Sequence, residues 1–222
     1  MEDKRLTLFA GHYGSGKTNI AVNYAMQLAK RGKKVCVADL DIVNPYFRTK
    51  DSEAELAALG ITLISPKYAN TNVDLPALPA ESYRLVQDRG VYGIMDIGGD
   101  DRGAYALGRY VPAIVAENDY RMAFVVNCYR PLTSTVEDTV AIMKEIEGAC
   151  GLKFTCIVNN SNIGEETTSQ SVIDSLEFVD DLCRATSLPL WMHTAEETVA
   201  RDLSGIPVMS LTLQKKYFDL PR

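Results

Sequence analysis

Short apolar runs alternate along the chain with longer segments in which apolar residues recur at helical spacing. Runs of strand character are predicted at residues 6–10, 34–39, 61–65, 91–97, 122–127, 154–158 and 188–193. Helices are predicted at residues 19–31, 52–59, 80–88, 103–117, 134–147 and 169–186. This alternation predicts a three-layer α/β fold, in which helices cover both faces of a mostly parallel sheet.

The helix after the first strand has the clearest pattern. Ala21, Ala25 and Leu28 fall on one stripe, and Gly32 follows a basic last turn, which is typical of a helix end. The most loop-like stretch, residues 66–79, is too short to separate two domains. A single domain over residues 1–222 is therefore predicted.

Composition narrows the classes of partner. The formal net charge of −6 argues against a generic electrostatic grip on nucleic acid or an anionic membrane. The five cysteines form no C-x-x-C pair, so neither a disulfide framework nor a zinc site is indicated. No signal-peptide core and no apolar run of membrane-spanning length is present, so a cytoplasmic protein is expected.

The segment that carries the chemistry lies between the first strand and the first helix. It matches the pattern G-x-x-x-x-G-K-[ST] without a mismatch and stands in the context that a P-loop requires. Its glycines allow backbone N–H groups to face phosphate oxygens, beside the positive end of a helix. Lys17 is predicted to reach the β- and γ-phosphates, and the hydroxyl of Thr18 to bind Mg²⁺. The predicted nucleotide-binding residues are Gly11, Tyr13, Gly14, Ser15, Gly16, Lys17, Thr18, Asn19 and, further along the chain, Asn159.

Two carboxylates follow the second predicted strand. Asp39 and Asp41 lie at its carboxyl end, the edge at which open α/β sheets bind ligands, and they point to the same side of an extended chain. This arrangement suits one carboxylate for the metal and the other for positioning an attacking water, so both are predicted at the metal site. The alternative is simple solvation at a strand end.

The predicted strand 91–97 contains a third carboxylate, Asp96, which begins a D-x-x-G arrangement. Asp96 is expected to hold Mg²⁺ through water. Gly98 or Gly99 is expected to offer an N–H to the γ-phosphate and to move when that phosphate leaves. The pattern is typical of a Walker B carboxylate that leads into a switch loop.

The predicted strand 154–158 runs into the asparagine-rich segment 159–162. A side-chain amide in this segment is expected to pair with the edge of the base, although Asn is also common in turns. The guanine-reading pattern N-K-x-D is absent, because no Lys follows the first Asn and Asn162 replaces the carboxylate. ATP is therefore predicted in preference to GTP.

With these motifs in this order along nearly its whole length, the chain resembles the ParA/MinD-type nucleotide-binding proteins (CobQ/CobB/MinD/ParA, SIMIBI class). The resemblance implies a sheet of seven or eight strands and a homodimer with nucleotide at or near the interface. It also implies roles for three residues: Asp41 positions water, Asp96 holds Mg²⁺ and Asn159 contacts adenine. One departure stands out, because His12 occupies the position of the family's signature lysine and Tyr13 replaces a glycine.

An imidazole is not a fixed cation at pH 7, so the departure predicts either slow hydrolysis or a charge from another residue, such as Arg48 or Arg102. Residues 44–48 take the place of a first switch. Within them, Tyr46 and Phe47 either face a partner or anchor the loop in the core.

The function predicted first is a Mg²⁺-dependent ATPase that acts as a nucleotide switch for an unidentified protein partner. Direct binding to nucleic acid or membrane is not expected, and the short tail at residues 211–220 is expected to pack on its own domain. A metal-insertion factor is a second hypothesis, but it would need a C-x-C pair or a His cluster, and only His12 and His193 are present. A small-molecule kinase or ligase of the dethiobiotin-synthetase type is a third.

Overall fold

The computed structural model describes residues 2–40, 49–65, 83–99 and 101–213. Its strands form one sheet in the order β3-β2-β4-β1-β5-β6-β7-β8, and every pair of neighbours is parallel. This confirms the predicted α/β fold with a parallel sheet. The strands are β1 (Leu6–Ala10), β2 (Val35–Leu40), β3 (Thr62–Ile64), β4 (Tyr92–Ile97), β5 (Tyr120–Val126), β6 (Cys156–Asn159), β7 (Leu190–Glu196) and β8 (Val208–Leu211).

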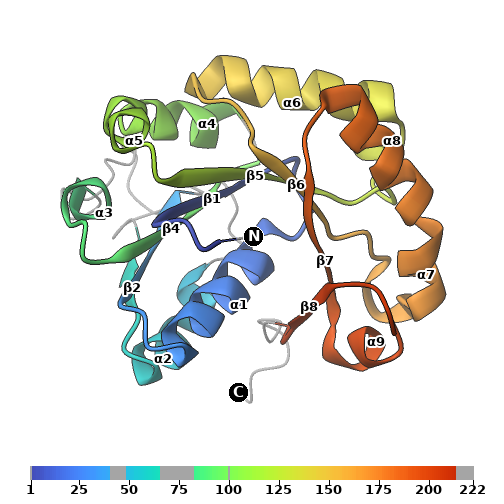
Figure 1. Cartoon of the computed structure of the whole chain (residues 1–222), viewed down its shortest axis with the longest axis horizontal. Helices are drawn as coiled ribbons and strands as arrows, with labels where there is room; N and C mark the ends of the chain where they lie inside the picture. Colours follow the sequence, from blue (N-terminus) through green and yellow to red (C-terminus); the bar gives the residue numbers. More distant parts are fainter. Residues whose placement is uncertain (1, 41–48, 66–82, 100, 214–222) are drawn as a thin grey trace, which may run out of the picture.

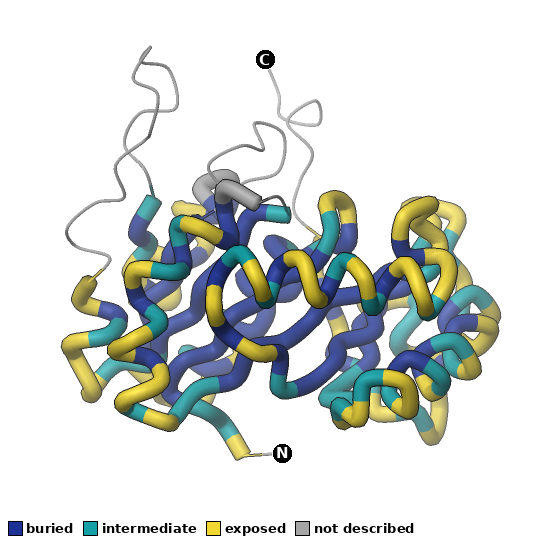
Figure 2. The backbone as a smooth tube through the Cα atoms, turned by 90° about the horizontal axis from the view of Figure 1, so that it is seen from above, coloured by how far each residue is buried: buried dark blue, intermediate teal, exposed yellow. Residues whose placement is uncertain are grey.

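Helices cover both faces of this sheet, with α1 and α2 on one side and α4, α5 and α6 on the other (Figure 1). Viewed from above, the buried strands lie between helices whose outer surfaces are exposed (Figure 2). The described helices are α1 (Lys17–Lys30), α2 (Glu53–Ala58), α3 (Arg84–Gln87), α4 (Asp101–Gly108), α5 (Val111–Glu117), α6 (Val136–Cys150), α7 (Ser169–Asp174), α8 (Leu176–Thr186) and α9 (Glu197–Arg201).

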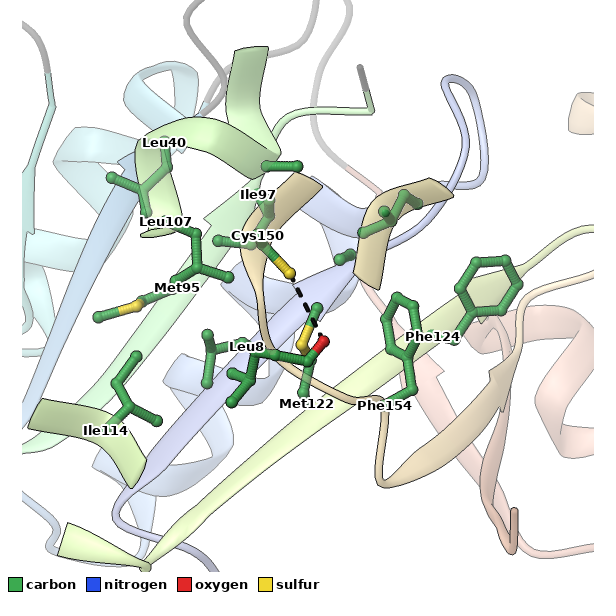
Figure 3. Packing of buried hydrophobic residues seen from close by; sticks show 14 of the residues in the cluster. Leu8, Leu40, Met95, Ile97, Leu107, Ile114, Met122, Phe124, Cys150 and Phe154 are labelled. Carbon is green, nitrogen blue, oxygen red and sulfur yellow. Dashed lines mark hydrogen bonds between the residues drawn. The ribbon is translucent and has the colours of Figure 1, made fainter. Parts of the chain in front are cut away.

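Each face of the sheet has its own apolar core. Phe9, Val37 and Ile94 pack against α1 on one face, and Leu8, Met95 and Phe124 pack on the other against α4, α5, α6 and α8. Figure 3 shows the second core, in which strand residues meet Leu107, Ile114 and Cys150 of the helices. Because successive strand residues point to opposite faces, the strands read as nearly continuous apolar runs, which is typical of a parallel sheet covered on both sides.

Two long helices predicted from the sequence are each broken in two. The segment predicted as 103–117 forms α4 and α5, and Pro112 lies in the first turn of α5, where its missing N–H costs nothing. The segment predicted as 169–186 breaks at Ser175, whose hydroxyl donates to the carbonyl oxygen of Val172 at 2.6 Å. The prediction of continuous helices was wrong at these two places because a polar side chain and a proline end the runs.

The first predicted strand, 6–10, coincides with β1, and most other described element bounds differ from the prediction by one to three residues. The predicted start of the helix at 80–88 lies outside the described residues. The helix predicted at 19–31 begins at Lys17, directly after the glycine-rich loop, and Gly32 follows it in the left-handed region at φ 76°. The strand predicted at 188–193 runs from Leu190 to Glu196, and β8 follows it at the end of the described chain. The short helix α9, absent from the prediction, lies between these two strands.

The carboxyl ends of β1, β2, β4, β5 and β6 meet at one edge of the sheet. In the register, Asp39 on β2 lies opposite Asp96 on β4, and Val126 on β5 lies opposite Asn159 on β6. The sheet therefore gathers the predicted site residues from the ends of β1, β2, β4 and β6 at this edge, which is where such folds bind ligands.

Candidate nucleotide site

The loop at residues 11–16 is shaped by its glycines. Gly14 and Gly16 have φ angles of 77° and 88°, in the left-handed region where an L side chain is strained. A Cβ atom at Gly11 would collide with the carbonyl oxygen of Val125, and one at Gly16 with the side-chain amide of Asn160. The glycines of the motif are therefore required by the packing of this loop as well as by its backbone conformation.

The loop leads directly into the N-terminus of α1. The amide of Ser15 donates to the carbonyl oxygen of His12 at 3.2 Å, and the amide of Ile20 closes the first helical turn on the carbonyl of Gly16 at 3.2 Å. Gly16 is the N-cap and caps α1 with no side chain. The first-turn amides and the positive end of the helix macrodipole therefore face the loop, which suits an oxyanion.

Lys17 and Thr18 open this helix and are buried. The ammonium of Lys17 folds back over the loop and donates to the carbonyl oxygen of His12 at 3.2 Å. Ser15 is 1% exposed, and its hydroxyl has no hydrogen-bond partner among the described residues. The ammonium of Lys17 and the hydroxyl of Ser15 both suit a phosphate ligand. The ammonium is a charged donor, and a buried hydroxyl that lacks a partner gains a hydrogen bond when a charged acceptor binds.

Asp39 and Asp96 are buried side by side on adjacent strands, on the face of the sheet that α1 covers. Thr49 donates its hydroxyl hydrogen to Oδ2 of Asp96 at 3.2 Å. Two carboxylates at neighbouring positions repel each other in their charged forms, and a divalent cation relieves that repulsion. Asp41, the third predicted carboxylate, lies outside the described residues.

These side chains fit a magnesium ion carried by a nucleotide. The hydroxyl of Thr18 and the carboxylates of Asp39 and Asp96 are oxygen donors, which Mg²⁺ prefers, and Mg²⁺ keeps much of its coordination for water and phosphate. Within residues 2–40, 49–65, 83–99 and 101–213, no cluster of three or more His, Cys, Asp or Glu residues has the form of a metal cage. The donor set therefore suits a metal that arrives with phosphates.

The segment after β4 touches the phosphate loop directly. A Cβ atom at Gly99 would lie 2.7 Å from the amide nitrogen of Tyr13 and 3.0 Å from Nζ of Lys17. A Cβ at Gly103, in α4, would lie 2.5 Å from Cα of Gly98. Gly99, one of the two predicted switch glycines, therefore lies against Lys17, which is predicted to reach the γ-phosphate.

A cavity of about 890 Å³ opens from the phosphate loop towards β6, β7 and the segment after β8. Its lining includes Tyr13, Gly14, Gly16, Lys17, Thr18 and Asn19 on the phosphate side. On the other side it includes Asn160, Asn162, Glu165, Thr194, Glu196 and Leu213. A cavity of this size accommodates a ligand as large as a nucleoside triphosphate.

Asn159, the predicted base contact, points away from this lining. Its amide nitrogen donates to the hydroxyl of Ser175 at 2.8 Å and lies 3.0 Å from Nδ1 of His193, and its oxygen accepts from the amide of Ser161 at 3.1 Å. Asn159 is 1% exposed. Its role as an adenine contact stays a prediction. In the structure, its side chain links β6 to Ser175 and to His193 of β7.

The next asparagines also bind protein groups. Asn160 donates to the carbonyl oxygen of Ser15 at 2.7 Å and accepts from the hydroxyl of Thr194 at 2.6 Å, so it ties β7 to the phosphate loop. Asn162 donates to the carbonyl of Asn160 at 2.8 Å. The asparagine run thus holds the wall of the cavity together.

Sequence reasoning missed three contributors to the site. Thr49 contacts Asp96, Thr194 orients Asn160, and Arg130 donates from Nε to the carbonyl oxygen of Gly14 at 3.2 Å. Arg130 carries the one detectable signal, because it follows the carboxyl end of a buried strand and precedes a proline. Arg48, proposed as a substitute cation, lies outside the described residues, and the side chain of Arg102 is likewise not described.

Comparison with protein families matches residues 6–177 to the CobQ/CobB/MinD/ParA nucleotide binding domain. The match covers most of the chain and includes the phosphate loop, Asp39, Asp96 and Asn159. The chain belongs to this family. A search of curated protein sequences finds no match.

Several solved structures share the fold of this CobQ/CobB/MinD/ParA domain at low sequence identity. The cell division protein FtsY of Thermotoga maritima aligns with a TM-score of 0.61 and 17% identity, over 88% of this chain and 63% of its own. The chloroplast FtsY of Physcomitrella patens gives a TM-score of 0.59 and 15% identity, over 87% of this chain and 59% of its own.

A third similar structure was solved with a nucleotide. The signal recognition particle 54 kDa protein of Aeropyrum pernix K1, in complex with GDP, gives a TM-score of 0.50 and 13% identity, over 85% of this chain and 40% of its own. The CobQ/CobB/MinD/ParA chain thus spans less than two thirds of each of these proteins, and the likeness concerns the fold. In the described part of the chain, no helix has the length and apolarity needed to cross a membrane.

Proposed function

We propose that this chain is a Mg²⁺-dependent ATPase that acts as a nucleotide switch on a protein partner. One observation carries the proposal: Gly99, which follows the Asp96 strand, lies against Tyr13 and Lys17 of the phosphate loop. A γ-phosphate between these groups would bind both segments, and its release would free them from each other. Family membership supports nucleotide binding, and the proposal adds the identity of the nucleotide, its hydrolysis and the switch.

In the proposed mechanism, the chain contributes mainly position and charge. The loop amides and Lys17 would hold the phosphates, and Thr18, Asp39 and Asp96 would hold Mg²⁺, which would supply charge neutralisation. Asp41 is assigned the positioning of the attacking water. Hydrolysis is expected to be slow, because His12 stands in the position of the family's signature lysine.

ATP remains the proposed nucleotide, on the ground that the N-K-x-D pattern is missing. Two observations are arguments for GTP. A structural neighbour was solved with GDP, and the cavity lining contains the carboxylates of Glu165, Glu196 and Glu197, which can accept from guanine. The choice between the two nucleotides is therefore the first quantity to measure.

Isothermal titration of ATP, ADP and GTP, each with and without Mg²⁺, tests the proposal on the wild-type chain and on Lys17→Ala. Tighter binding of ATP than of GTP is expected, with a requirement for Mg²⁺. The Lys17→Ala variant is expected to bind on the order of 100-fold more weakly, since a charge-assisted contact is lost. Equal heats from the two proteins, independent of Mg²⁺, would refute nucleotide binding at this loop.

Size-exclusion chromatography with a slowly hydrolysed ATP analogue separates the switch from the kinase-type alternative. A homodimer that forms only with the analogue supports the switch, as the family resemblance implies. A monomer under every condition would favour transfer to a small substrate. The described residues contain no C-x-C pair and no metal cluster that would favour a metal-insertion factor.

A further inference from the structure

Arg130 lies at the phosphate loop although it comes from a distant part of the chain. Its Nε donates to the carbonyl oxygen of Gly14 at 3.2 Å. A Cβ atom on Gly14 would be 3.6 Å from Nε and 3.8 Å from the guanidinium carbon. Arg130 also lines the same cavity as Lys17 and Thr18. The guanidinium therefore lies within van der Waals reach of the Gly14 backbone, directly beside the loop.

The turn that carries Arg130 is held at both ends. The fully buried Asn127 accepts from the amide of Tyr129 through its side chain and from the amide of Arg130 through its backbone carbonyl. The amide of Thr133 donates back to the carbonyl of Arg130 at 3.0 Å. Pro131 keeps Arg130 extended, at φ −91° and ψ 136°. The backbone at Arg130 is therefore already ordered before a ligand binds, although the side chain itself is exposed.

The cavity lining, as far as the structure describes it, contains few cationic side chains to balance the charge of a nucleotide. Among the described residues of the lining, the cationic side chains are Lys17 and Arg130, and the anionic ones include Glu165 and Glu196. A nucleoside triphosphate brings several negative charges into this space. Arginine binds phosphate through a planar fork of donors, and the hydrogen bond to Gly14 uses only Nε, so the terminal nitrogens remain to point at a ligand.

We propose that Arg130 is a second phosphate-binding cation, which holds the di- or triphosphate of the nucleotide from the side of Gly14. This inference deepens the proposed function and rests on it. Arg130 neutralises part of the phosphate charge in the same chain that carries the loop. It therefore distinguishes ATP and ADP from AMP, whose single phosphate does not extend along the loop.

Titration of ATP, ADP and AMP in the presence of Mg²⁺ tests the inference on Arg130→Ala, Arg130→Gln and Arg130→Lys. The first two variants are expected to bind ATP and ADP about tenfold more weakly than wild type, with AMP affected less than about twofold. Lysine keeps the charge but loses the Nε contact, whereas glutamine keeps a donor and loses the charge. Arg130→Lys is therefore expected to bind ATP more tightly than Arg130→Gln.

Arg184→Ala is the matched control, because Arg184 is an exposed arginine of α8 outside the cavity lining. It is expected to bind all three nucleotides as wild type does. An equal loss for ATP, ADP and AMP in Arg130→Ala would mean that Arg130 only supports the loop, and would overturn the inference. So would glutamine and lysine variants of equal affinity, or unchanged binding in all three variants.

Lys17→Ala keeps the two proposals apart. If Lys17→Ala loses ATP while the Arg130 variants keep it, the nucleotide function stands and only the role of Arg130 falls. If neither Lys17→Ala nor any Arg130 variant changes the binding of ATP, the loop is not the binding site and both proposals fail.

Discussion

The two ends of the cavity are built by different means. At the phosphate end, residues 11–18 present backbone amides in a loop whose conformation requires glycine. The G-x-x-x-x-G-K-[ST] pattern predicts both features. At the other end, Asn160 and Asn162 line the cavity and look like recognition residues, but they and the neighbouring Asn159 bind protein groups. A motif that acts through the backbone can be recognised from sequence, whereas an amide side chain has many possible partners, and only the structure identifies them.

Asn159 and Asn160 make two different kinds of connection. Asn160 couples the ends, because it joins Ser15 of the phosphate loop to Thr194 of β7. Asn159 stays on the opposite side of the strand and joins β6 to Ser175 and His193. Two adjacent residues of the same type therefore belong to different parts of the molecule, and substitution experiments can distinguish them.

Among the substitutions that compare the two ends, the largest effect is expected at the phosphate end, in Gly16→Ala. The left-handed backbone costs about 1–2 kcal/mol with a Cβ, and the new methyl group must also displace the amide of Asn160. We expect a lower urea midpoint and at least about a tenfold loss of ATP affinity, since the loop must shift.

Gly148→Ala is the control for this substitution, because Gly148 lies in α6 with open space around its Cβ position. It is expected to stabilise the chain by up to about 1 kcal/mol and to leave nucleotide binding unchanged. If Gly16→Ala had the urea midpoint and the ATP affinity of the wild type, the left-handed backbone of Gly16 and its close contact with Asn160 would be contradicted.

A second effect separates the two asparagines. Asn159→Ala and Asn160→Ala each leave buried partners unsatisfied, and each is expected to lower the free energy of unfolding by about 2 kcal/mol. Only Asn160→Ala is expected to weaken ATP binding, because only Asn160 supports Ser15. Urea unfolding and titration of ATP and GTP measure both quantities.

The ratio of ATP to GTP affinity decides the role of Asn159. If Asn159 has only a structural role, the ratio of ATP to GTP affinity stays the same in Asn159→Ala. A ratio that shifts towards GTP would instead establish the adenine contact that the family resemblance implies.

The smallest effect is a pH dependence located at the asparagine end. Burial lowers the pKa of His193, and Asp180 partly opposes this shift. The unfolded chain therefore takes up a proton near pH 6.5, before the folded chain does, and the free energy of unfolding falls as pH decreases below that value. Protonation also removes the acceptor that faces Asn159.

Urea unfolding between pH 5 and pH 8 measures this dependence. His193→Gln is expected to flatten the slope between pH 5 and pH 6.5, because the titrating group is gone. Parallel curves for the variant and the wild type would show that other groups set the pH dependence.

Much of the fold was predictable because it depends on patterns within short segments. The strand and helix alternation predicted the parallel sheet, and Gly32 predicted the end of α1. Pro112 and Ser175 broke two predicted helices, because a single residue outweighed an apolar pattern that continues across it. Asp39 and Asp96 were predicted at one edge since both end strands, but Arg130 was missed because its contact with Gly14 spans 116 residues.

The strand order has a consequence for synthesis. The strand that carries the phosphate loop is translated first, but its two neighbours are β4, whose Gly93 lies opposite Leu6, and β5, whose Tyr120 also lies opposite Leu6. Asn160, which braces the loop through Ser15, is made later still. A nascent chain therefore cannot complete its nucleotide pocket until residue 160 has left the ribosome, and a ligand present during translation can stabilise the pocket only after that point.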